Sequence, residues 1–390
     1  MVPVAFYSRY LPDLVALCVV TLAQSAGLLA ILRGPAAGAG KVVRRALVSA
    51  WAASLAVLVL GTVLRFARVA RYFPSWFSGW GRGIAILWAF LSLLMLAAYA
   101  LSRVVPRPRV AHSPARRTLL RSLRWAVLGA PVAALGYGTF IQRFRLSLLE
   151  KNLFIPGLPK DLEGLRVVQL TDIHLSPFLS VRELERAVEI ANETRAHIAL
   201  VTGDLITTES DPLDECLDRL SRLRADAGIW GCMGNHEIYA GTEEYTQVEG
   251  ARLGIHFLRQ EARLLRFGGA DLNLAGVDYQ RSGRPYLPGV EELIVPGAFN
   301  VLLSHNPDAF PVAAQKGFPL TIAGHTHGGQ VRVEILGRDL NIARFFTPYV
   351  YGIYRQGNSS IFVSRGIGTI GLPARLGAPP EVALLKLCRT

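Results

Sequence analysis

The chain has 390 residues, of which 51% are hydrophobic, and its 42 Lys and Arg against 29 Asp and Glu give a formal net charge of +13. The basic excess lies before residue 151, where 18 Lys and Arg face only Asp13 and Glu150, whereas the remaining residues carry a net charge of −3. Basic residues that flank apolar segments indicate membrane anchoring rather than nucleic-acid binding, and four cysteines without a CxxC pair exclude a zinc knuckle or a disulfide framework as the expected fold.

Four apolar segments follow one another in the first part of the chain. Each is about as long as the ~20 residues that a helix needs to cross a bilayer, and none contains a charged residue. Their limits are Leu14–Leu32, Ala46–Leu64, Ile84–Leu101 and Trp125–Ile141. These segments predict an all-α transmembrane region of about four helices over residues 1–148, and the three spans that follow the first argue against a cleaved signal peptide.

The charges of the connecting loops predict the orientation of these spans. The first and third loops lie on one side of the membrane and together carry more Lys and Arg than the second loop. The positive-inside rule places them in the cytoplasm, so the part of the chain after the fourth span is expected outside it. The four arginines of the second loop, with Arg143 and Arg145, argue in the other direction.

After residue 148 short apolar runs alternate with amphipathic, charged stretches. Helices are predicted over Ser180–Thr194 and Pro212–Leu223, the second capped by Asp211. Strands are predicted at Leu165–Leu170, Ile198–Thr202, Ile229–Met233, Leu272–Val277, Asn300–Ser304, Leu320–Ala323, Val331–Ile335, Ile361–Ser364 and Val382–Leu387. A β-α-β-α-β start with a strand-rich second half predicts an α/β domain with mixed sheets over residues 149–390.

Polar motifs follow five of these predicted strands, at the edge where open α/β sheets bind ligands. In chain order they are Asp172-Ile173-His174, Gly203-Asp204, Gly234-Asn235-His236-Glu237, Ser304-His305-Asn306 and Gly324-His325-Thr326-His327-Gly328-Gly329-Gln330. Taken singly, each motif is more often an ordinary turn or helix cap than a site. Five in succession, holding five of the eight histidines, indicate one shared metal centre. The other histidines, His112, His197 and His256, are expected to be surface or core residues.

The donor types indicate which metals this centre would bind. A mixture of carboxylate, amide and imidazole ligands suits divalent Mn, Fe or Zn. On an extended strand end Asp172 and His174 would point to the same side and hold one ion together, whereas His325 and His327 would serve two neighbouring ions. The glycines of the motifs would let the backbone turn tightly beside the metals.

The order D-x-H, G-D, G-N-H-E, S-H and G-H-T-H-G-G-Q resembles the calcineurin-like metallophosphoesterase family. It is most similar to the membrane-associated bacterial branch of YkuE- and YaeI-like phosphodiesterases. Segments 158–167, 363–368 and 379–382 are also similar to that branch. The resemblance covers about residues 150–390, and the apolar segments before it are not part of the shared domain.

This resemblance implies a four-layer α/β/β/α sandwich around two divalent metal ions that lower the pKa of a shared water for attack on phosphorus. One ion would be held by Asp172, His174, Asp204 and His327, and the other by Asp204, Asn235, His305 and His325. His236 would protonate the leaving oxygen or bind phosphate. Glu237 would either orient His236 or be a solvated surface acid, and Arg365 would either contact phosphate or form a structural ion pair.

The resulting interpretation is a membrane-anchored phosphoesterase of a bacterial cell membrane that cleaves phosphodiester or pyrophosphate bonds. Because Ile141 and Leu165 are separated by less than about 80 Å of chain, its substrate is expected to be lipid-linked or close to the membrane. Leu175, Phe178, Leu179, Phe345 and Phe346 would lie against lipid or, alternatively, pack in the core. The alternatives are a non-catalytic receptor or scaffold with a structural metal site, and a four-helix transporter; the complete ligand set disfavours the first, and the lack of charged residues within the spans disfavours the second.

Overall fold

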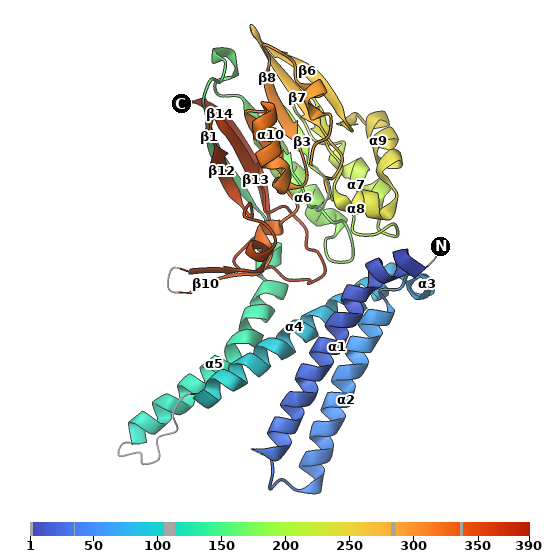
Figure 1. Ribbon diagram of the computed structural model, residues 1–390, viewed down its shortest axis with the longest axis vertical. Helices are drawn as coiled ribbons and strands as arrows, with labels where there is room; N and C mark the ends of the chain where they lie inside the picture. The colour runs from blue at the N-terminus through green and yellow to red at the C-terminus, as the bar shows by residue number, and fades with distance from the viewer. Residues whose placement is uncertain (1–2, 35, 105–113, 282–285, 336–337) are drawn as a thin grey trace. The chain divides into compact units, whose positions relative to one another are not determined.

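The computed structural model describes residues 3–34, 36–104, 114–281, 286–335 and 338–390, which form two compact units (Figure 1). The helical unit comprises Met1–Thr139 with Gly371–Pro373, and the α/β unit comprises Phe140–Ile370 with Ala374–Thr390. Part of the third predicted loop, residues 105–113 with His112, lies outside the described residues. A domain boundary at residue 148 stays a prediction.

The helical unit contains all four of the predicted apolar segments as helices. Its helices are α1 (Pro3–Arg33), α2 (Lys41–Val63), α3 (Ala67–Ala70), α4 (Ser75–Val104) and α5 (Pro114–Phe140). Within the described residues, three stretches are long and apolar enough to cross a membrane: Asp13–Arg33, Lys41–Val63 and Ser75–Ser102. The fourth predicted segment forms the second half of α5, whose first half carries arginines that lower its mean hydropathy.

A chain of polar side chains joins the three apolar helices of this unit. Gln24 on α1 accepts a hydrogen bond from Ser54 of α2 (2.8 Å) and donates one to Ser92 of α4 (2.9 Å). Trp88 of α4 donates its indole N–H to Ser54. In a bilayer such bonds hold helices together, because the alternative is an unsatisfied polar group in hydrocarbon.

The α/β unit is built on two six-stranded sheets. The first has the order β1 (Ser147–Ile155), β14 (Glu381–Arg389), β2 (Arg166–Leu170), β3 (Ile198–Val201), β4 (Ile229–Gly231) and β5 (Ile255–Phe257). The second has the order β12 (Gly352–Gln356), β13 (Ser359–Val363), β9 (Leu320–Ala323), β8 (Phe299–Leu303), β7 (Ala270–Gly276) and β6 (Glu261–Phe267). A separate hairpin pairs β10 (Arg332–Ile335) with β11 (Arg338–Asn341) and projects from the sheets (Figure 1).

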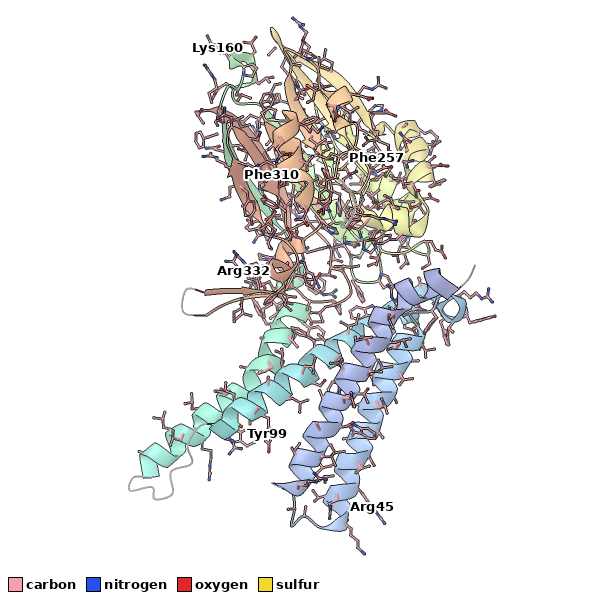
Figure 2. The ribbon with its side chains drawn as sticks, viewed as in Figure 1. Arg45, Tyr99, Lys160, Phe257, Phe310 and Arg332 are labelled. Atoms are coloured by element: carbon pink, nitrogen blue, oxygen red, sulfur yellow. The ribbon has the colours of Figure 1, made fainter. Side chains whose placement is uncertain are left out.

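Helices cover the outer face of each sheet, which gives the expected four layers. The α-helices of the unit are α6 (Val181–Glu193), α7 (Leu213–Leu220), α8 (Asn235–Ala240), α9 (Glu243–Arg252) and α10 (Phe310–Lys316). Short 3-10 helices are η1 (Gln142–Phe144), η2 (Lys160–Leu162), η3 (Val290–Leu293), η4 (Pro307–Ala309), η5 (His327–Gly329) and η6 (Ile342–Phe345). Helices α6 and α7 pack on the first sheet, and Phe310 of α10 packs on the second (Figure 2).

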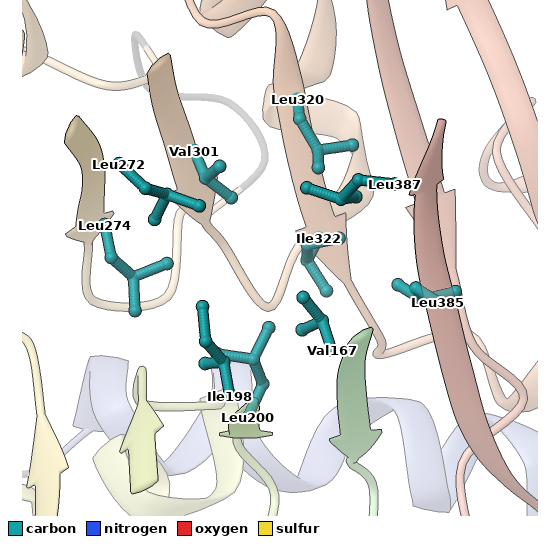
Figure 3. A pocket seen from close by; sticks show the side chains of 10 residues that line it. All are labelled: Val167, Ile198, Leu200, Leu272, Leu274, Val301, Leu320, Ile322, Leu385 and Leu387. Atoms are coloured by element: carbon teal, nitrogen blue, oxygen red, sulfur yellow. The ribbon is translucent and has the colours of Figure 1, made fainter. Parts of the chain in front are cut away.

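Between the two sheets lies a layer made mainly of apolar side chains. Figure 3 shows ten of them facing one another across the two sheets, among them Val167 and Leu200 from the first sheet and Leu274 and Ile322 from the second. Each sheet is covered by apolar side chains on its inner face and by helices on its outer face. Polar side chains therefore gather at the ends of the strands.

The predicted elements overlap observed ones, but one helix cap differs and several observed elements were not predicted, namely strands β1, β5, β6, β11 and β12 and helices α8, α9 and α10. All nine predicted strands overlap observed strands, and Ser180 caps α6 through a capping box with Glu183. Asp211 does not cap α7, because its carboxylate instead accepts hydrogen bonds from the backbone N–H groups of Thr207 and Thr208. Strand β1 was not predicted; it lies in the stretch read as part of the connector.

Candidate metal centre

Five strand-end loops bring the motif residues together at one edge of the α/β unit. Strands β2, β3 and β4 are parallel neighbours in the first sheet, and β8 and β9 are parallel neighbours in the second, so their carboxyl ends meet. Six of the eight predicted site residues are buried there: Asp172, His174, Asp204, Asn235, His305 and His327. The other two, His236 and His325, are half-buried.

The side chains form three overlapping groups that could hold a cation. In the first group, ligand atoms of Asp172, His174 and His327 all lie within 4.8 Å of one another; in the second, those of Asp204, His305 and His325; and in a third, those of His174, Asp204 and His236. The first two groups resemble the ligand sets that the motif order implied, apart from Asn235 and the sharing of Asp204, and the assignment of ligands stays a prediction. His325 and His327 enter different groups although only one residue separates them.

Asp204 lies between the first and second groups. Its Oδ2 is 3.5 Å from Nε2 of His174 in the first group and 3.1 Å from Nε2 of His305 in the second. Its Oδ1 accepts a hydrogen bond from the backbone N–H of His236 (2.9 Å). A carboxylate in this position can contribute to both groups.

Some donor atoms in the centre lack the hydrogen bonds that buried polar atoms normally form. The Oδ1 of Asn235 is buried, and no described group forms a hydrogen bond with it. The Nε2 atoms of His174 and His327 face each other at 3.2 Å. Because buried polar atoms are normally satisfied, these atoms fit divalent cations of the kind named above.

Hydrogen bonds to the opposite ring nitrogens fix which atom each histidine presents. The Nδ1 of His305 is 2.7 Å from the carbonyl oxygen of Thr202, which can only accept, so Nδ1 donates and Nε2 faces Asp204. The Nδ1 of His174 is 3.1 Å from the hydroxyl of Thr207. Such outer contacts orient metal-binding imidazoles.

The backbone of the ligand loops is not extended, which corrects the reason given for pairing Asp172 with His174. Their φ angles are 50° and 47°, in the left-handed region that non-glycine residues seldom adopt. Asp204, His325 and His327 share this region, with φ angles of 56°, 75° and 51°. Both residues of the D-x-H motif still reach one group, so strained loops rather than strand geometry position the ligands.

Glu237 is fully buried, so its interpretation as a solvated surface acid is wrong. Its carboxylate accepts hydrogen bonds from the backbone N–H groups of Asp204 (2.9 Å), Leu205 (2.7 Å) and Gly234 (2.8 Å). It therefore ties the loop after β3 to the loop after β4. Gly203 fits this junction because a Cβ there would lie 2.4 Å from the backbone nitrogen of Gly234.

His236 is oriented by a residue that the sequence did not indicate. Its Nδ1 lies 2.7 Å from the carbonyl oxygen of Thr207, which can only accept, so Nδ1 donates. Its ring packs edge-on against His174, with centroids 4.7 Å apart. Burial is the largest influence on His236 and lowers its pKa.

Two arginines near the centre have structural contacts. Arg365 donates to the buried carboxylate of Glu381 (2.6 Å), which matches the structural ion pair rather than a phosphate contact. Arg375 is fully buried, donates to the carbonyl oxygens of Gly368 and Ala378, and places Nη2 3.3 Å from Nδ1 of His327. Arg375 was not predicted, and it braces the His327 ring from behind.

Two tyrosines that were also not predicted, Tyr279 and Tyr239, lie beside the second group. The hydroxyl of Tyr279 lies 3.5 Å from Nε2 of His325, and its ring is 6.4 Å from that of Tyr239. Tyr279 follows the end of β7 in the sequence Val277-Asp278-Tyr279. The same signal that identified the other motifs, a polar residue just past an apolar strand, would have found it.

The residues expected against lipid divide into two kinds. Leu175 and Leu179 pack in the core cluster of the first sheet, so the alternative of ordinary packing is right for them, and Phe178 is half-buried. Phe345 and Phe346 are 87% and 82% exposed. Ordinary core packing is therefore wrong for the two phenylalanines, and their contact with lipid stays a prediction.

With this fold and centre in view, the chain belongs to the calcineurin-like phosphoesterase family, which it matches over residues 165–329. It is 31% identical to the phosphodiesterase YaeI of Escherichia coli (strain K12) over 232 residues, covering 57% of this chain and 82% of the relative. Members of the family generally bind two divalent metal ions, and this chain is a metal-dependent phosphoester hydrolase.

Other relatives match more of the chain. The metallophosphoesterase YkuE of Bacillus subtilis (strain 168) is 27% identical over 282 residues, which is 70% of this chain and 98% of the relative. The transmembrane protein with metallophosphoesterase domain of Danio rerio is 26% identical over 324 residues, covering 78% and 71%. Together with the three apolar helices, the second match identifies a membrane protein.

Proposed function

We propose that this protein hydrolyses a phosphodiester or pyrophosphate bond in a lipid or another substrate close to the membrane, using two divalent cations. The observation that supports this most is the pair of ligand groups that meet at Asp204. Asp172, His174, Asp204 and His327 would hold one cation, and Asp204, Asn235, His305 and His325 the other. Mn, Fe and Zn all suit these donors.

Bound cations would supply charge neutralisation at the phosphoryl group and a water of lowered pKa. The residues of the chain do the rest. Asp204 stays ionised: burial acts to raise its pKa, but the positive charge of His305 and His236 outweighs burial and holds the pKa well below its ordinary value. His236 donates a hydrogen bond from Nδ1 to the carbonyl oxygen of Thr207, so Nε2 is the atom that would face the substrate. When the ring carries a second proton, on Nε2, it would protonate the leaving oxygen or bind phosphate.

Chain length supports a substrate near the bilayer. The apolar second half of α5 ends at Phe140, and β1 begins at Ser147 as a full member of the first sheet. The connection is therefore much shorter than the sequence indicated, at most about 25 Å when extended. A centre tethered this closely to apolar helices meets esters in lipid headgroups at a high local concentration.

The orientation of the protein belongs to the same proposal. The larger number of Lys and Arg in the first and third loops favours a cytoplasmic position for those loops and an external position for the α/β unit, in a bacterial cell membrane. The YkuE and YaeI relatives are bacterial, which supports this choice of membrane.

The substrate proposal is tested by presenting one phosphodiester in two forms to the full-length protein. One form is the lipid in mixed micelles, and the other is its short-chain soluble analogue. We expect a catalytic efficiency on the micellar form at least about tenfold higher, because the membrane-embedded enzyme shares a surface with it. Equal efficiency on both forms would contradict the lipid preference while leaving the hydrolase activity intact.

A further inference from the structure

The β10–β11 hairpin and η6 carry an unusual run of exposed apolar side chains. Within residues 332–335 and 338–346, here called the apolar arm, Val333, Leu340, Ile342, Phe345 and Phe346 are 40%, 57%, 49%, 87% and 82% exposed. Single exposed apolar residues are common on soluble proteins, but five within one short segment form a patch of the kind that marks an interaction surface. Two of them are phenylalanines with almost their whole rings in solvent.

The arm is held firmly at its base, so its exposure is not that of a loose loop. Asn341 is buried; its amide donates to the carbonyl oxygen of Gly328 (3.0 Å), and its Oδ1 accepts from the N–H of Ala343 (3.0 Å). On the other side, the N–H of Arg332 donates to the carbonyl oxygen of Leu376 (2.7 Å). The arm thus projects from two fixed points (Figure 2, where Arg332 marks its base).

The base of the arm adjoins the place where the chain enters the α/β unit from the apolar helices. Gln142 lies two residues after Phe140, the last residue of α5, and its side chain accepts a hydrogen bond from the N–H of Gly377 (2.7 Å). A Cβ on Gly377 would lie 2.3 Å from the carbonyl oxygen of Arg332. Gly377 therefore lies between Gln142, where the chain enters the α/β unit, and Arg332, at the base of the arm.

We infer that the apolar arm is a membrane-docking element whose phenylalanines insert into the interfacial region of the same bilayer that holds the apolar helices. The occupant is lipid because the arm begins beside the point at which the chain leaves its apolar segments, so the surface closest to it along the chain is a bilayer. Exposed aliphatic side chains on β10 and β11, with exposed phenylalanines in and just after η6, are suited to the boundary between headgroups and acyl chains.

This placement has a consequence for the metal centre. The arm follows directly on η5, which contains His327, and Asn341 of the arm bonds to Gly328 in the same 3-10 helix. Docking would therefore fix the height of the His327 loop above the headgroups. The inference concerns a surface rather than the reaction, and it does not depend on which ester is hydrolysed.

The test measures the depth of the arm in the full-length protein, reconstituted in phosphatidylcholine and phosphatidylglycerol vesicles. Cys18, the exposed cysteine among the four, is first replaced by Ala; Cys216, Cys232 and Cys388 are buried. Phe346→Cys is labelled with an environment-sensitive dye, and quenching is compared for a nitroxide on the lipid acyl chain and for iodide in the water. Val248→Cys on α9, where Val248 is 71% exposed, is the matched control.

We expect lipid-borne quenching at position 346 to exceed that at position 248 by about threefold or more, with the opposite order for iodide. Equal quenching at both positions would overturn the inference. A dye at 346 shielded from both quenchers would also overturn it, since the arm would then be covered by protein, for example a second copy of the chain. Metal content and thermal unfolding of both variants show that they are folded, and hydrolysis is scored separately, so failure of docking is distinguishable from failure of the proposed activity.

Discussion

At the scale of single residues, the centre holds two histidines, His305 and His325, in different protonation states. Burial alone would lower the pKa of His305, but the negative charges of Asp204 and Asp172 and a hydrogen bond to Asp204 raise it to about 10. Burial, together with the charge of His305, lowers the pKa of His325 to about 3. The two rings are 5.1 Å apart. In the metal-free chain at neutral pH, the ring of His305 is therefore protonated and charged, and the ring of His325 is neutral.

This difference predicts that metal uptake releases a proton from His305. With a raised pKa of about 10, its ring is charged at pH 8, and a nitrogen that binds a metal must give up its proton. We expect addition of Mn or Zn to metal-free protein at pH 8 to release about one proton more per chain from the wild type than from His305→Ala. The release is measured by calorimetry in buffers of different ionisation enthalpy, and equal release from the two proteins would contradict the assignment.

His236 is predicted to serve the reaction without holding a metal. His236→Ala should lower kcat by roughly 10²- to 10³-fold, because a positioned proton donor contributes on that order. The metal content should stay at the wild-type level. His256→Ala is the matched control, since His256 stacks on Trp230 at an exposed position of β5. Loss of metal from the His236 variant would assign that residue to the ligand set instead.

At the scale of elements, the centre depends on contacts between loops that follow different strands. The apolar runs of β2, β3, β8 and β9, each followed by polar residues, made these loops predictable. The left-handed backbone of Asp172 and His174 was not, because tertiary contacts impose it and no local pattern marks it. Thr207 acts on His236 through its carbonyl oxygen, which any residue type would supply, so the sequence carries no signal for it.

Glu237 is predicted to be the main connection between two of these loops. Glu237→Gln replaces one of the two acceptor oxygens by an amide NH2, which cannot accept. Either the N–H of Leu205 or the N–H groups of Asp204 and Gly234 then lose their partner. We expect a loss of about 2–4 kcal/mol in the free energy of unfolding, because buried donors lose their partner. Glu215→Gln, at an exposed position in the first turn of α7, should change stability by less than about 0.5 kcal/mol. Thermal unfolding in detergent compares the two, and similar midpoints would contradict the role of Glu237.

At the scale of the whole molecule, composition predicted two regions of different character, and the structure contains a helical unit and an α/β unit. The unpredicted β1 shows the limit of this reasoning. Its sequence, SLLEKNLFI, includes Glu150 and Lys151 and has no regular alternation, and its partner β14 lies more than 200 residues further along the chain. Pairing over such a distance leaves little trace in a local pattern.

The excess of Lys and Arg in the first and third loops predicts the topology. A reporter that is active only outside the cytoplasm, fused after Thr390, should be active, and a reporter that requires the cytoplasm should be silent. The fusion point is suitable because β14 ends at Arg389, at the end of the α/β unit. The reverse pattern would move the metal centre into the cytoplasm and remove the orientation from the proposal.

The central claim, two cations held around one shared carboxylate and used to cleave a phosphodiester, is tested most directly at Asp204. The measurement is the metal-to-protein ratio together with hydrolysis of an aryl phosphodiester, for wild type and Asp204→Asn purified in detergent. We expect about two metals per chain and turnover in the wild type. In the variant we expect a lower metal content and loss of hydrolysis, because the carboxylate proposed to be shared by both cations is weakened. Near-normal turnover by Asp204→Asn would contradict it.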